Sequence, residues 1–463
     1  MKSLPGLPLS RRELLAGAAA PALAQQKRAP ARPPNILLIL CDDLAAWMLG
    51  CYGNQEIRTP NIDLLARSGT RFVNSFVCTP ICSASRATLF TGRLPRQHGI
   101  HDFLTAKPIE RPPQGQASPP PSFKDEIMLS DILARQGYQC GYVGKWHMAE
   151  DAQPQHNFSF WYSLLGGGYQ NPRMSWNGQP AQEKGYLAEL LTAKALQFLD
   201  QQTPDRPFFL TVSHFNPHVP YDGHPARYYE MYAQTSFETL GWEPPAPHAL
   251  REKEMLQDIV GNIRKCAAAT TALDDQIPPL LAKLDERGLR SSTLIVFTGD
   301  NGFLLGRHGL WSKGLASDPI NMYEEVMQVP MIWNWRGKVP VEGARPELVS
   351  FYDFLPTICE AAGVAAPEGR NLCGRSYLAL ATNRPLPKKQ TWRSLVFGEF
   401  RNTWMARDSR YKLVLRNEGK GPNELYDLRA DPREKVNRYD DPGFLNVRQA
   451  LAQELAEWRK RYT

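Results

Sequence analysis

No apolar run in the sequence is long enough to span a bilayer, because a membrane-spanning helix needs about 20 consecutive apolar residues. The chain also lacks an extended Lys/Arg block and any aromatic–basic repeat, which excludes the usual patterns of nucleic-acid-binding proteins. Its eight cysteines are few for 463 residues and form no CxxC pair, so the fold does not depend on a disulfide framework. These absences leave a globular protein that we expect to bind no nucleic acid.

The composition is ordinary for a globular protein, with 42% hydrophobic and 22% charged residues. A chain of 463 residues can bury a large core and form one large domain with a smaller appendage. The net charge of +7 is consistent with an anionic substrate, and equally with binding to a membrane surface or to nucleic acid. Because the basic residues are scattered along the chain, an anionic substrate is the preferred interpretation.

The N-terminus has the features of an export signal. Ser10–Leu15 contains two adjacent arginines, a weakly apolar run follows, and Ala22–Ala24 matches a small-x-small cleavage site. Residues 1–24 are therefore predicted to be a signal peptide that the twin-arginine translocase recognises, followed by a linker at 25–34. We expect a periplasmic or secreted protein with no stable membrane insertion after cleavage, and a disordered basic tail is the alternative.

Short apolar runs separated by helical patterns predict an α/β fold. Asn35–Leu40 is apolar on both faces, as in a buried strand of a parallel sheet. Further elements are predicted as strands at Tyr138–Val143, Phe208–Val212 and Thr293–Phe297, and as helices at Asn61–Gly69, capped by Thr59 and Pro60, at Leu187–Leu199 and at Glu254–Arg287. We therefore expect a large, mostly parallel central sheet flanked by helices, with binding residues beyond its strand ends.

The pattern of the chain changes from about Leu386. Short strands in a meander are predicted at Ser394–Phe400, Asn402–Arg407 and Tyr411–Leu415, and a helix at Val447–Tyr462. The sequence thus predicts a large α/β domain over residues 35–385. A small C-terminal subdomain, made of an antiparallel sheet and a helix, is predicted over residues 386–463.

Two polar pairs directly follow predicted strands. Asp42 and Asp43 come after the first strand, and Asp300 and Asn301 follow the strand at Thr293–Phe297. Either pair alone would often only cap a helix or turn, but two such pairs after strands of one α/β fold indicate a shared site. All four side chains offer hard oxygen ligands, which suit Ca²⁺ or Mg²⁺ rather than zinc.

The segment Cys82–Arg93 has a nucleophile-type residue four positions before an arginine and closes with Thr-Gly-Arg. A helix is predicted from residue 83 to 94, with Arg86 on the same face as Cys82. The amides at the start of this helix would favour an anion beside Cys82. The alternative is a buried structural cysteine followed by an ordinary helix.

This segment resembles the signature of the sulfatase family, which has Cys or Ser, any residue, Pro or sometimes Ala, any residue, Arg, and then Thr-Gly-Arg. Cys78 is followed by the proline but lacks the arginine, so Cys82 is the better match. Ala84 stands where the commoner pattern has Pro, which leaves open which maturation enzyme accepts the site.

The resemblance implies an alkaline phosphatase-like fold and a cysteine that a formylglycine-generating enzyme oxidises to formylglycine. The hydrate of this aldehyde would attack the sulfur of a sulfate ester. A thiolate is a good nucleophile but would leave a thiosulfate-type adduct with no easy exit. The resemblance also implies one divalent ion, Ca²⁺ in preference to Mg²⁺, bound by Asp42, Asp43, Asp300, Asn301 and the oxygen at position 82.

Three further motifs follow in the family's order. Gly144–His147 matches its Gly-Lys-Trp-His, His218 matches the histidine of its Pro-His-x-Pro, and Lys313 follows Asp300 as in sulfatases. In an extended segment Lys145 and His147 would point the same way. A lone lysine is usually only solvated and a lone histidine usually structural, which is the alternative for each residue.

The same resemblance implies a role for each cation. Lys145 would bridge the sulfate and the aldehyde hydrate, and His147 would deprotonate the hydroxyl that drives sulfate release. His218 and Lys313 would contact the sulfate and the leaving oxygen, one of them donating the proton. His98 and His101 are expected to have surface or structural roles.

The sequence therefore predicts an exported sulfatase that hydrolyses a sulfate monoester to an alcohol and inorganic sulfate. A sulfated sugar, an aryl sulfate and a small sulfate ester all remain open as substrates, and the predicted export favours a sulfated glycan. One alternative is a phosphonate monoester or phosphodiester hydrolase of the same superfamily. The other is a non-enzymatic anion- or glycan-binding protein in which Cys82 stays a thiol.

Overall fold

A computed structural model of the chain describes residues 32–104, 123–166, 168–388 and 390–462. Residues 33–463 form one compact unit. The predicted signal peptide and most of the linker lie outside the described residues. The boundary predicted at residues 385–386 stays a prediction.

A ten-stranded mixed sheet forms the centre of this unit, in the order β11-β2-β10-β9-β1-β8-β4-β5-β6-β7. Its strands, in chain order, are β1 Asn35–Asp42, β2 Thr70–Phe72, β4 Gln139–Gly144, β5 Phe160–Gly166, β6 Arg173–Trp176, β7 Gln179–Gln182, β8 Phe208–Pro217, β9 Thr293–Gly299, β10 Met331–Asn334 and β11 Gly343–Arg345. The neighbouring strands β9, β1, β8, β4 and β5 run parallel. The predicted mostly parallel sheet is confirmed, and antiparallel strands extend both of its ends.

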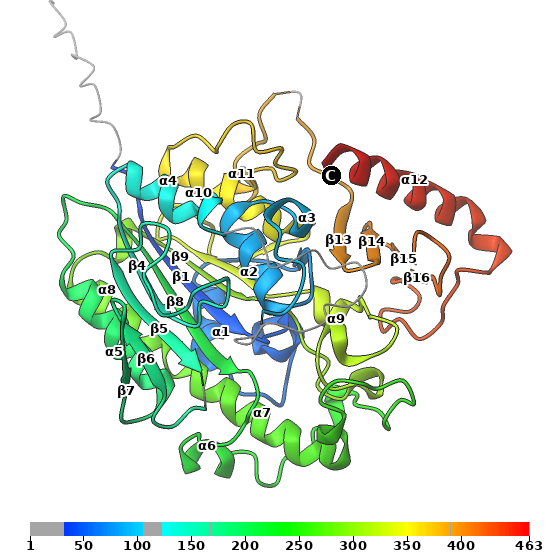
Figure 1. Cartoon of the computed structure of the whole chain (residues 1–463), viewed down its shortest axis with the longest axis horizontal. Helices are drawn as coiled ribbons and strands as arrows, with labels where there is room; N and C mark the ends of the chain where they lie inside the picture. The colour runs from blue at the N-terminus through cyan, green and yellow to red at the C-terminus, as the bar shows by residue number, and fades with distance from the viewer. Residues whose placement is uncertain (1–31, 105–122, 167, 389, 463) are drawn as a thin grey trace, which may run out of the picture. The chain divides into compact units, whose positions relative to one another are not determined.

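Helices cover both faces of the sheet (Figure 1). The longer helices are α1 Pro60–Arg67, α2 Cys82–Thr91, α4 Leu129–Arg135, α5 Leu187–Asp200, α7 Ile259–Asp274, α8 Ile277–Glu286, α10 Phe354–Ala362 and α12 Leu445–Tyr462. Helices α2, α4 and α10 share one core cluster with the sheet, and α1, α5, α7 and α8 share another. The shorter helices are α3 Pro95–His98, α6 Ala226–Glu230, α9 Glu324–Met327 and α11 Leu378–Ala381.

The continuous apolar run of β1 is explained by this layered arrangement. Alternate side chains of a strand point to opposite faces of the sheet. Ile36, Leu38 and Leu40 pack into the α2–α4–α10 core, whereas Leu37 and Ile39 pack into the core on the other face. Every residue of β1 is buried, so both faces need apolar side chains.

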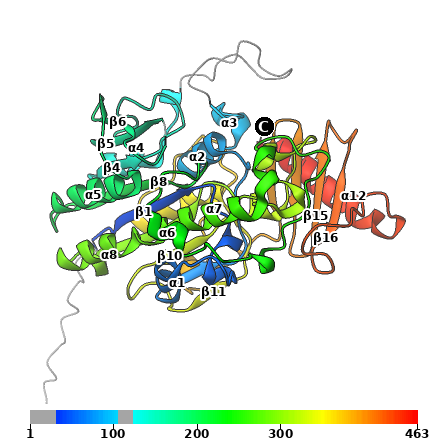
Figure 2. The ribbon, with the colours of Figure 1, turned by 90° about the horizontal axis from the view of Figure 1, so that it is seen from below.

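A four-stranded antiparallel sheet and the last helix form the C-terminal part of the unit. The strands β13 Val396–Phe400, β14 Thr403–Arg407, β15 Tyr411–Arg416 and β16 Glu424–Asp427 pair in chain order. Helix α12 packs against β14 and β15, at one end of the molecule in Figure 2. The predicted small antiparallel sheet with a helix is confirmed.

One predicted helix is wrong as a single element. The segment predicted as a helix at Glu254–Arg287 forms a 3₁₀ turn at Lys253–Asp258 and the two helices α7 and α8. Pro278, at the start of α8, has no amide hydrogen to bond within a continuing helix, so the chain begins a new helix there. None of the helices in the described ranges has the length and apolarity needed to cross a membrane.

Candidate active site

The carboxyl ends of β1 and β9 bring the two predicted polar pairs together. The Asp43 amide donates a hydrogen bond to Asp300 Oδ1 at 3.0 Å, and Asn301 Nδ2 donates to Asp43 Oδ1 at 2.8 Å. Asp42 is the last residue of β1, and all four side chains are buried. The four residues thus form one cluster at the end of adjacent parallel strands.

Strand β4 delivers Lys145 to the same cluster. Gly144 ends β4 with φ +118°, and a Cβ at this position would lie 1.9 Å from Ser213 O of β8, so only glycine fits. The close approach lets the Lys145 amide donate to Ser213 O at 3.0 Å. Lys145 Nζ then lies 2.5 Å from Asp42 Oδ2.

Phe215 of β8 supports two of the predicted cations. Lys145 Nζ lies 5.4 Å from the centroid of the Phe215 ring. The His218 ring stacks on the Phe215 ring, with the two centroids 4.8 Å apart. His218 Nε2 lies 3.6 Å from Asp43 Oδ2. The aromatic side chain therefore helps to fix two groups beside the carboxylates.

Helix α2 presents Cys82 at its first position, and every residue of this helix is buried. Its polar side chains bond to the surroundings: Ser83 Oγ accepts from the Leu104 amide at 3.1 Å, and Ser85 Oγ donates to the Asp300 carbonyl. A buried polar group without such a partner would destabilise the fold. Ser85 thus fastens the helix to the residue that follows β9, and Ser83 fastens it to the loop at Leu104.

Cys82 lies close to Asp42, the last residue of β1, to the following Asp43 and to a lysine. Its Sγ is 3.4 Å from Asp42 Oδ1, 3.9 Å from Asp43 Oδ1 and 2.8 Å from Lys313 Nζ. Lys313 Nζ also donates to Asp43 Oδ1. The predicted nucleophile position, the carboxylates and the loop lysine therefore converge.

Arg86 lies one helical turn after Cys82 and is fully buried. Its Nε donates to Asp300 Oδ2 at 2.8 Å, and its Nη1 donates to Lys145 O and Ser213 Oγ, both at 2.8 Å. Five donors in a rigid plane allow arginine to bridge three groups at once. Through Asp300, Lys145 and Ser213, Arg86 joins helix α2 to the ends of β9 and β4 and to β8.

The charges of the cluster shift each other's pKa. Burial alone would raise the pKa of Asp42, but the positive charges around it, first of all Lys145, hold that pKa well below its usual value. Burial would lower the pKa of Lys313, and Asp43 reverses this and raises it well above its usual value. Burial raises the pKa of the Cys82 thiol well above its usual value, although both lysines oppose the shift.

His147 sits beside the cluster in a backbone conformation that the sequence did not predict. Its φ is +59°, so Lys145 and His147 are not alternate residues of an extended strand. His147 Nε2 lies 2.8 Å from Leu104 O, and because a carbonyl only accepts, Nε2 carries the proton. Nδ1 is buried without a hydrogen-bond partner and is the free basic nitrogen. Burial and the neighbouring Lys145 hold the pKa of His147 well below its usual value.

The donor set fits a hard divalent cation. Among the described residues, Asp42, Asp43, Cys82 and His218 each offer one ligand atom, and these atoms lie within 4.8 Å of one another. Asp43 Oδ2 and Asn301 Oδ1 are buried without a hydrogen-bond partner, which leaves oxygen lone pairs available. Carboxylate and amide oxygens are preferred ligands of Ca²⁺ and Mg²⁺.

Asp300 differs from the other predicted ligands in that both its carboxylate oxygens already accept hydrogen bonds. Oδ1 accepts from the Asp43 amide and Oδ2 from Arg86 Nε. Burial and the negative charge of Asp42 raise the pKa of Asp300 to about 6, against the effect of Arg86. The compact group of possible ligands contains His218 instead of Asp300, although the sequence predicted His218 as a contact of the sulfate and the leaving oxygen and not as a ligand.

The Sulfatase family model matches residues 34–364, which include all of the converging residues. The chain belongs to the sulfatase family. A second model, that of the C-terminal part of N-sulphoglucosamine sulphohydrolase, matches residues 306–461. The predicted enzyme class, a sulfuric ester hydrolase, is confirmed.

Relatives of this sulfatase match it over most of their length. An N-acetylglucosamine-6-O-sulfatase of Bacteroides thetaiotaomicron is 26% identical, covering 100% of this chain and 92% of the relative. Human arylsulfatase A is 28% identical, covering 88% and 84%. A protein solved in complex with its substrate D-glucosamine-2-N,6-O-disulfate shares the fold, with a TM-score of 0.79, 24% identity and coverage of 93% and 98%.

Cys78 and His98 of this sulfatase lie outside the cluster. Cys78 is buried in the apolar cluster next to the C-terminal sheet, and burial raises its pKa well above the usual value. His98 is buried, with Nε2 3.2 Å from Thr88 Oγ1 and Nδ1 accepting from the Ile100 amide at 3.2 Å. The structural role predicted for His98 is confirmed, and Cys82 is the cysteine at the site.

Three residues around the cluster carry no signal in the sequence. Ser213 accepts from Arg86, Asp151 Oδ1 accepts from the His147 amide at 2.8 Å, and the Glu252 carboxyl interacts with Asp43. Asp151 follows the Gly-Lys-Trp-His motif closely, but no regular pattern marks it as the group that fixes His147. Ser213 and Glu252 become recognisable only when the fold is known.

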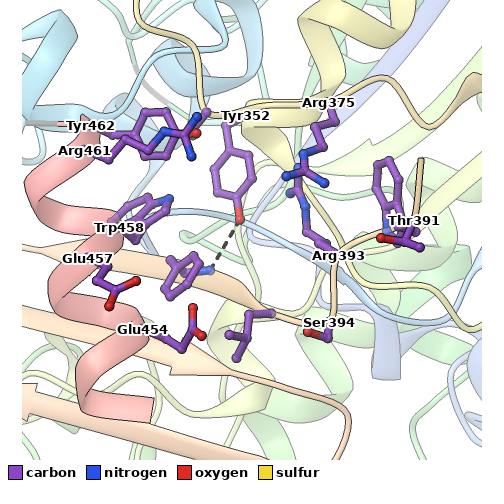
Figure 3. Close-up of a pocket in the computed structure, with 14 residues that line it drawn as sticks. Tyr352, Arg375, Thr391, Arg393, Ser394, Glu454, Glu457, Trp458, Arg461 and Tyr462 are labelled. Carbon is purple, nitrogen blue, oxygen red and sulfur yellow. Dashed lines mark hydrogen bonds between the residues drawn. The ribbon is translucent and has the colours of Figure 1, made fainter. Parts of the chain in front are cut away.

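A separate pocket of about 410 Å³ lies between α12 and the segment before β13 (Figure 3). Glu454, Trp458 and Arg461 of α12 form one side, with Tyr352 and Arg393 across from them. None of the residues predicted to act in catalysis lines it. The pocket is therefore distinct from the cluster around Cys82.

Proposed function

We propose that this sulfatase hydrolyses sulfate monoesters through a formylglycine made from Cys82. The observation that supports the proposal is the position of Cys82 Sγ, within 3.9 Å of two carboxylates and 2.8 Å from Lys313 Nζ. Burial keeps the pKa of the thiol high, so an unmodified Cys82 would be a poor nucleophile at neutral pH. The aldehyde hydrate would supply the attacking oxygen and a second hydroxyl that allows sulfate to leave.

The overall reaction consumes one water molecule: the bond between sulfur and the ester oxygen breaks, and the products are the alcohol and hydrogen sulfate. Lys145 and Lys313 flank the position of Cys82 and would bind the anionic sulfate group. Arg86 donates to Asp300 and Ser213 through Nε and Nη1, so it holds the site together and adds a fixed positive charge, while its Nη2 is buried without a hydrogen-bond partner, 3.8 Å from Asp42 Oδ1. His147 offers Nδ1 as the base that takes a proton from the second hydroxyl.

We further propose one divalent cation, Ca²⁺ in preference to Mg²⁺. Asp42, Asp43, Asn301 and the group at position 82 would hold it, with His218 or Asp300 beside them. Ca²⁺ accepts more ligands and a less regular geometry than Mg²⁺, which suits this mixed set. A bound cation would neutralise charge on the sulfate oxygens.

The proposed substrate is a sulfated sugar. The name of the similar Bacteroides N-acetylglucosamine-6-O-sulfatase and the glucosamine disulfate bound as substrate in a similar solved structure both support a sulfated amino sugar. An aryl sulfate remains a useful probe because human arylsulfatase A is also similar. Export by the twin-arginine translocase, proposed from residues 1–24, would bring the enzyme to extracellular or periplasmic glycans.

Turnover of 4-nitrophenyl sulfate and of bis(4-nitrophenyl) phosphate tests the proposal. We expect the wild-type enzyme to cleave the sulfate with the higher kcat/KM, and Cys82→Ala to abolish the activity. Cys78→Ala is the matched control, because Cys78 is also buried but lies outside the cluster. A preference for the phosphodiester, or an active Cys82→Ala variant, would reject the proposed reaction.

A further inference from the structure

Glu252 lies at the edge of the reactive cluster, and no step of the proposed reaction uses it. Its carboxyl group interacts electrostatically with Asp43 and Lys313, and the Ser312 hydroxyl lies beside it. Oε2 of Glu252 is buried and has no hydrogen-bond partner. A buried carboxylate oxygen without a donor is costly unless a ligand supplies one.

The backbone holds this side chain in an unusual conformation. Glu252 has φ +57° and ψ 25°, in the left-handed region that residues with a Cβ seldom adopt. It stands directly before the 3₁₀ turn at Lys253–Asp258, and its carbonyl accepts from the Met255 amide at 3.0 Å. Backbone strain of this kind is concentrated at functional sites.

The residues before Glu252 place this loop beside the segment that carries Lys313, because the Leu250 amide donates to the Ala316 carbonyl at 2.7 Å. The Arg251 guanidinium lies 5.4 Å from the centroid of the Phe103 ring, and Phe103 packs edge-on against His147 with centroids 4.6 Å apart. The segment Arg251–Glu252 therefore lies near His147, through Phe103, and near Lys313, one of the two lysines proposed to bind the sulfate. A group attached to the sulfate would pass beside it.

We propose that Glu252 is a specificity-determining residue, whose Oε2 accepts a hydrogen bond from a hydroxyl or amine of the alcohol portion of the substrate. A sugar sulfate carries such donors next to its ester group, whereas a nitrophenyl group carries none. Glu252 would thus select polyhydroxylated or amino-sugar esters over aryl esters. This inference rests on the proposed sulfatase reaction and adds the recognition of the alcohol portion.

The test compares two substrates in Glu252→Gln, which keeps the size of the side chain and removes its charge. We expect kcat/KM for N-acetylglucosamine 6-sulfate to fall about ten- to a hundredfold, because the amide replaces one acceptor oxygen by an NH₂ group that cannot accept the substrate's hydrogen bond. The kcat/KM for 4-nitrophenyl sulfate should stay within about twofold of wild type. Glu254→Gln is the control, because Glu254 is an exposed glutamate two residues away.

The outcomes separate this inference from the proposed function. An equal loss for both esters would mean that Glu252 only positions Lys313, and would overturn the inference. Cleavage of 4-nitrophenyl sulfate alone by the wild-type enzyme would also overturn it while leaving the sulfatase reaction intact. Failure of the wild-type enzyme to cleave either ester would instead reject the proposed function.

Discussion

Arg86 Nε lies 2.8 Å from Asp300 Oδ2, and both side chains are fully inaccessible to solvent. The pair connects the second turn of α2 with the residue that follows β9, and Arg86 also reaches Lys145 O and Ser213 Oγ. The arginine of the signature is therefore the point at which four segments of the site are joined. Its loss should affect the fold as well as the reaction.

Arg86→Lys should destabilise the protein although it keeps the charge. A lysine ammonium cannot reproduce the planar set of donors, so at least one buried acceptor would lose its partner. We expect a loss of about 2–4 kcal/mol in the free energy of unfolding, measured by urea denaturation. Arg96→Lys is the control, because its ion pair with Glu399 is partly exposed and should contribute less. Equal losses in the two variants would contradict the joining role of Arg86.

Asp300→Ala should weaken metal binding as well as turnover. Asp300 fixes the Asp43 amide at 3.0 Å, so its removal disturbs a proposed ligand even if Asp300 itself lies outside the first coordination sphere. Calcium affinity, measured by titration, should fall about 10–100-fold. Asp285→Ala removes an exposed carboxylate paired with Arg336 and should leave the affinity unchanged. Unchanged affinity in Asp300→Ala would remove Asp300 from the metal site.

His147→Gln should lower turnover without loss of metal. His147 supplies the proposed base through Nδ1, and loss of a general base typically reduces kcat about 10²–10⁴-fold. His156→Gln, which changes a histidine bonded to Asp131, should retain activity. Steady-state kinetics together with the calcium content would show the difference. Full activity in His147→Gln would assign the proton transfer to another group.

The lowered pKa of the buried His98 should make the stability of the protein depend on pH, independently of catalysis. Burial lowers the pKa of His98 from its ordinary value of 6.5 to about 3. Between these values the unfolded chain binds a proton that the folded chain does not, so stability falls as the pH decreases below about 6.5. Between pH 6.5 and 5 the cost is about 2 kcal/mol.

Urea denaturation of wild type and His98→Gln at pH 7.5 and pH 5 measures how much His98 contributes to the pH dependence of stability. The variant is expected to be less stable at pH 7.5, because the bonds to Thr88 and Ile100 change. Its stability should fall less between the two pH values than that of wild type. Parallel losses in the two proteins would show that His98 does not contribute to the pH dependence.

Much of the fold could be predicted from the sequence, because local signals and burial agree. The run Asn35–Leu40 is apolar on both faces and forms the central strand of the parallel sheet. The segment Glu254–Arg287 was predicted as one helix, since its pattern is helical on both sides of Pro278. The position of the break depends on the packing of α7 and α8 against different neighbours, which a periodic pattern does not contain.

The candidate site shows the same division between local and tertiary information. Asp42, Cys82 and Lys145 lie in recognisable motifs, and the sheet brings them together as expected. The left-handed backbone of His147 and the nearby Glu252 carboxyl were not predictable, because both depend on contacts between segments far apart in the chain. Residues that support or select the substrate have no motif of their own.

The chemical state of residue 82 tests the central claim most directly. Cleavage by trypsin after Arg71 and Arg86 releases a peptide that contains both Cys78 and Cys82, so one molecule carries its own control. In protein from the native host, mass spectrometry after alkylation should show one alkylated cysteine, Cys78, and a residue 82 that is about 18 Da lighter than cysteine and not alkylated. A fully active enzyme with both cysteines alkylated would contradict the account.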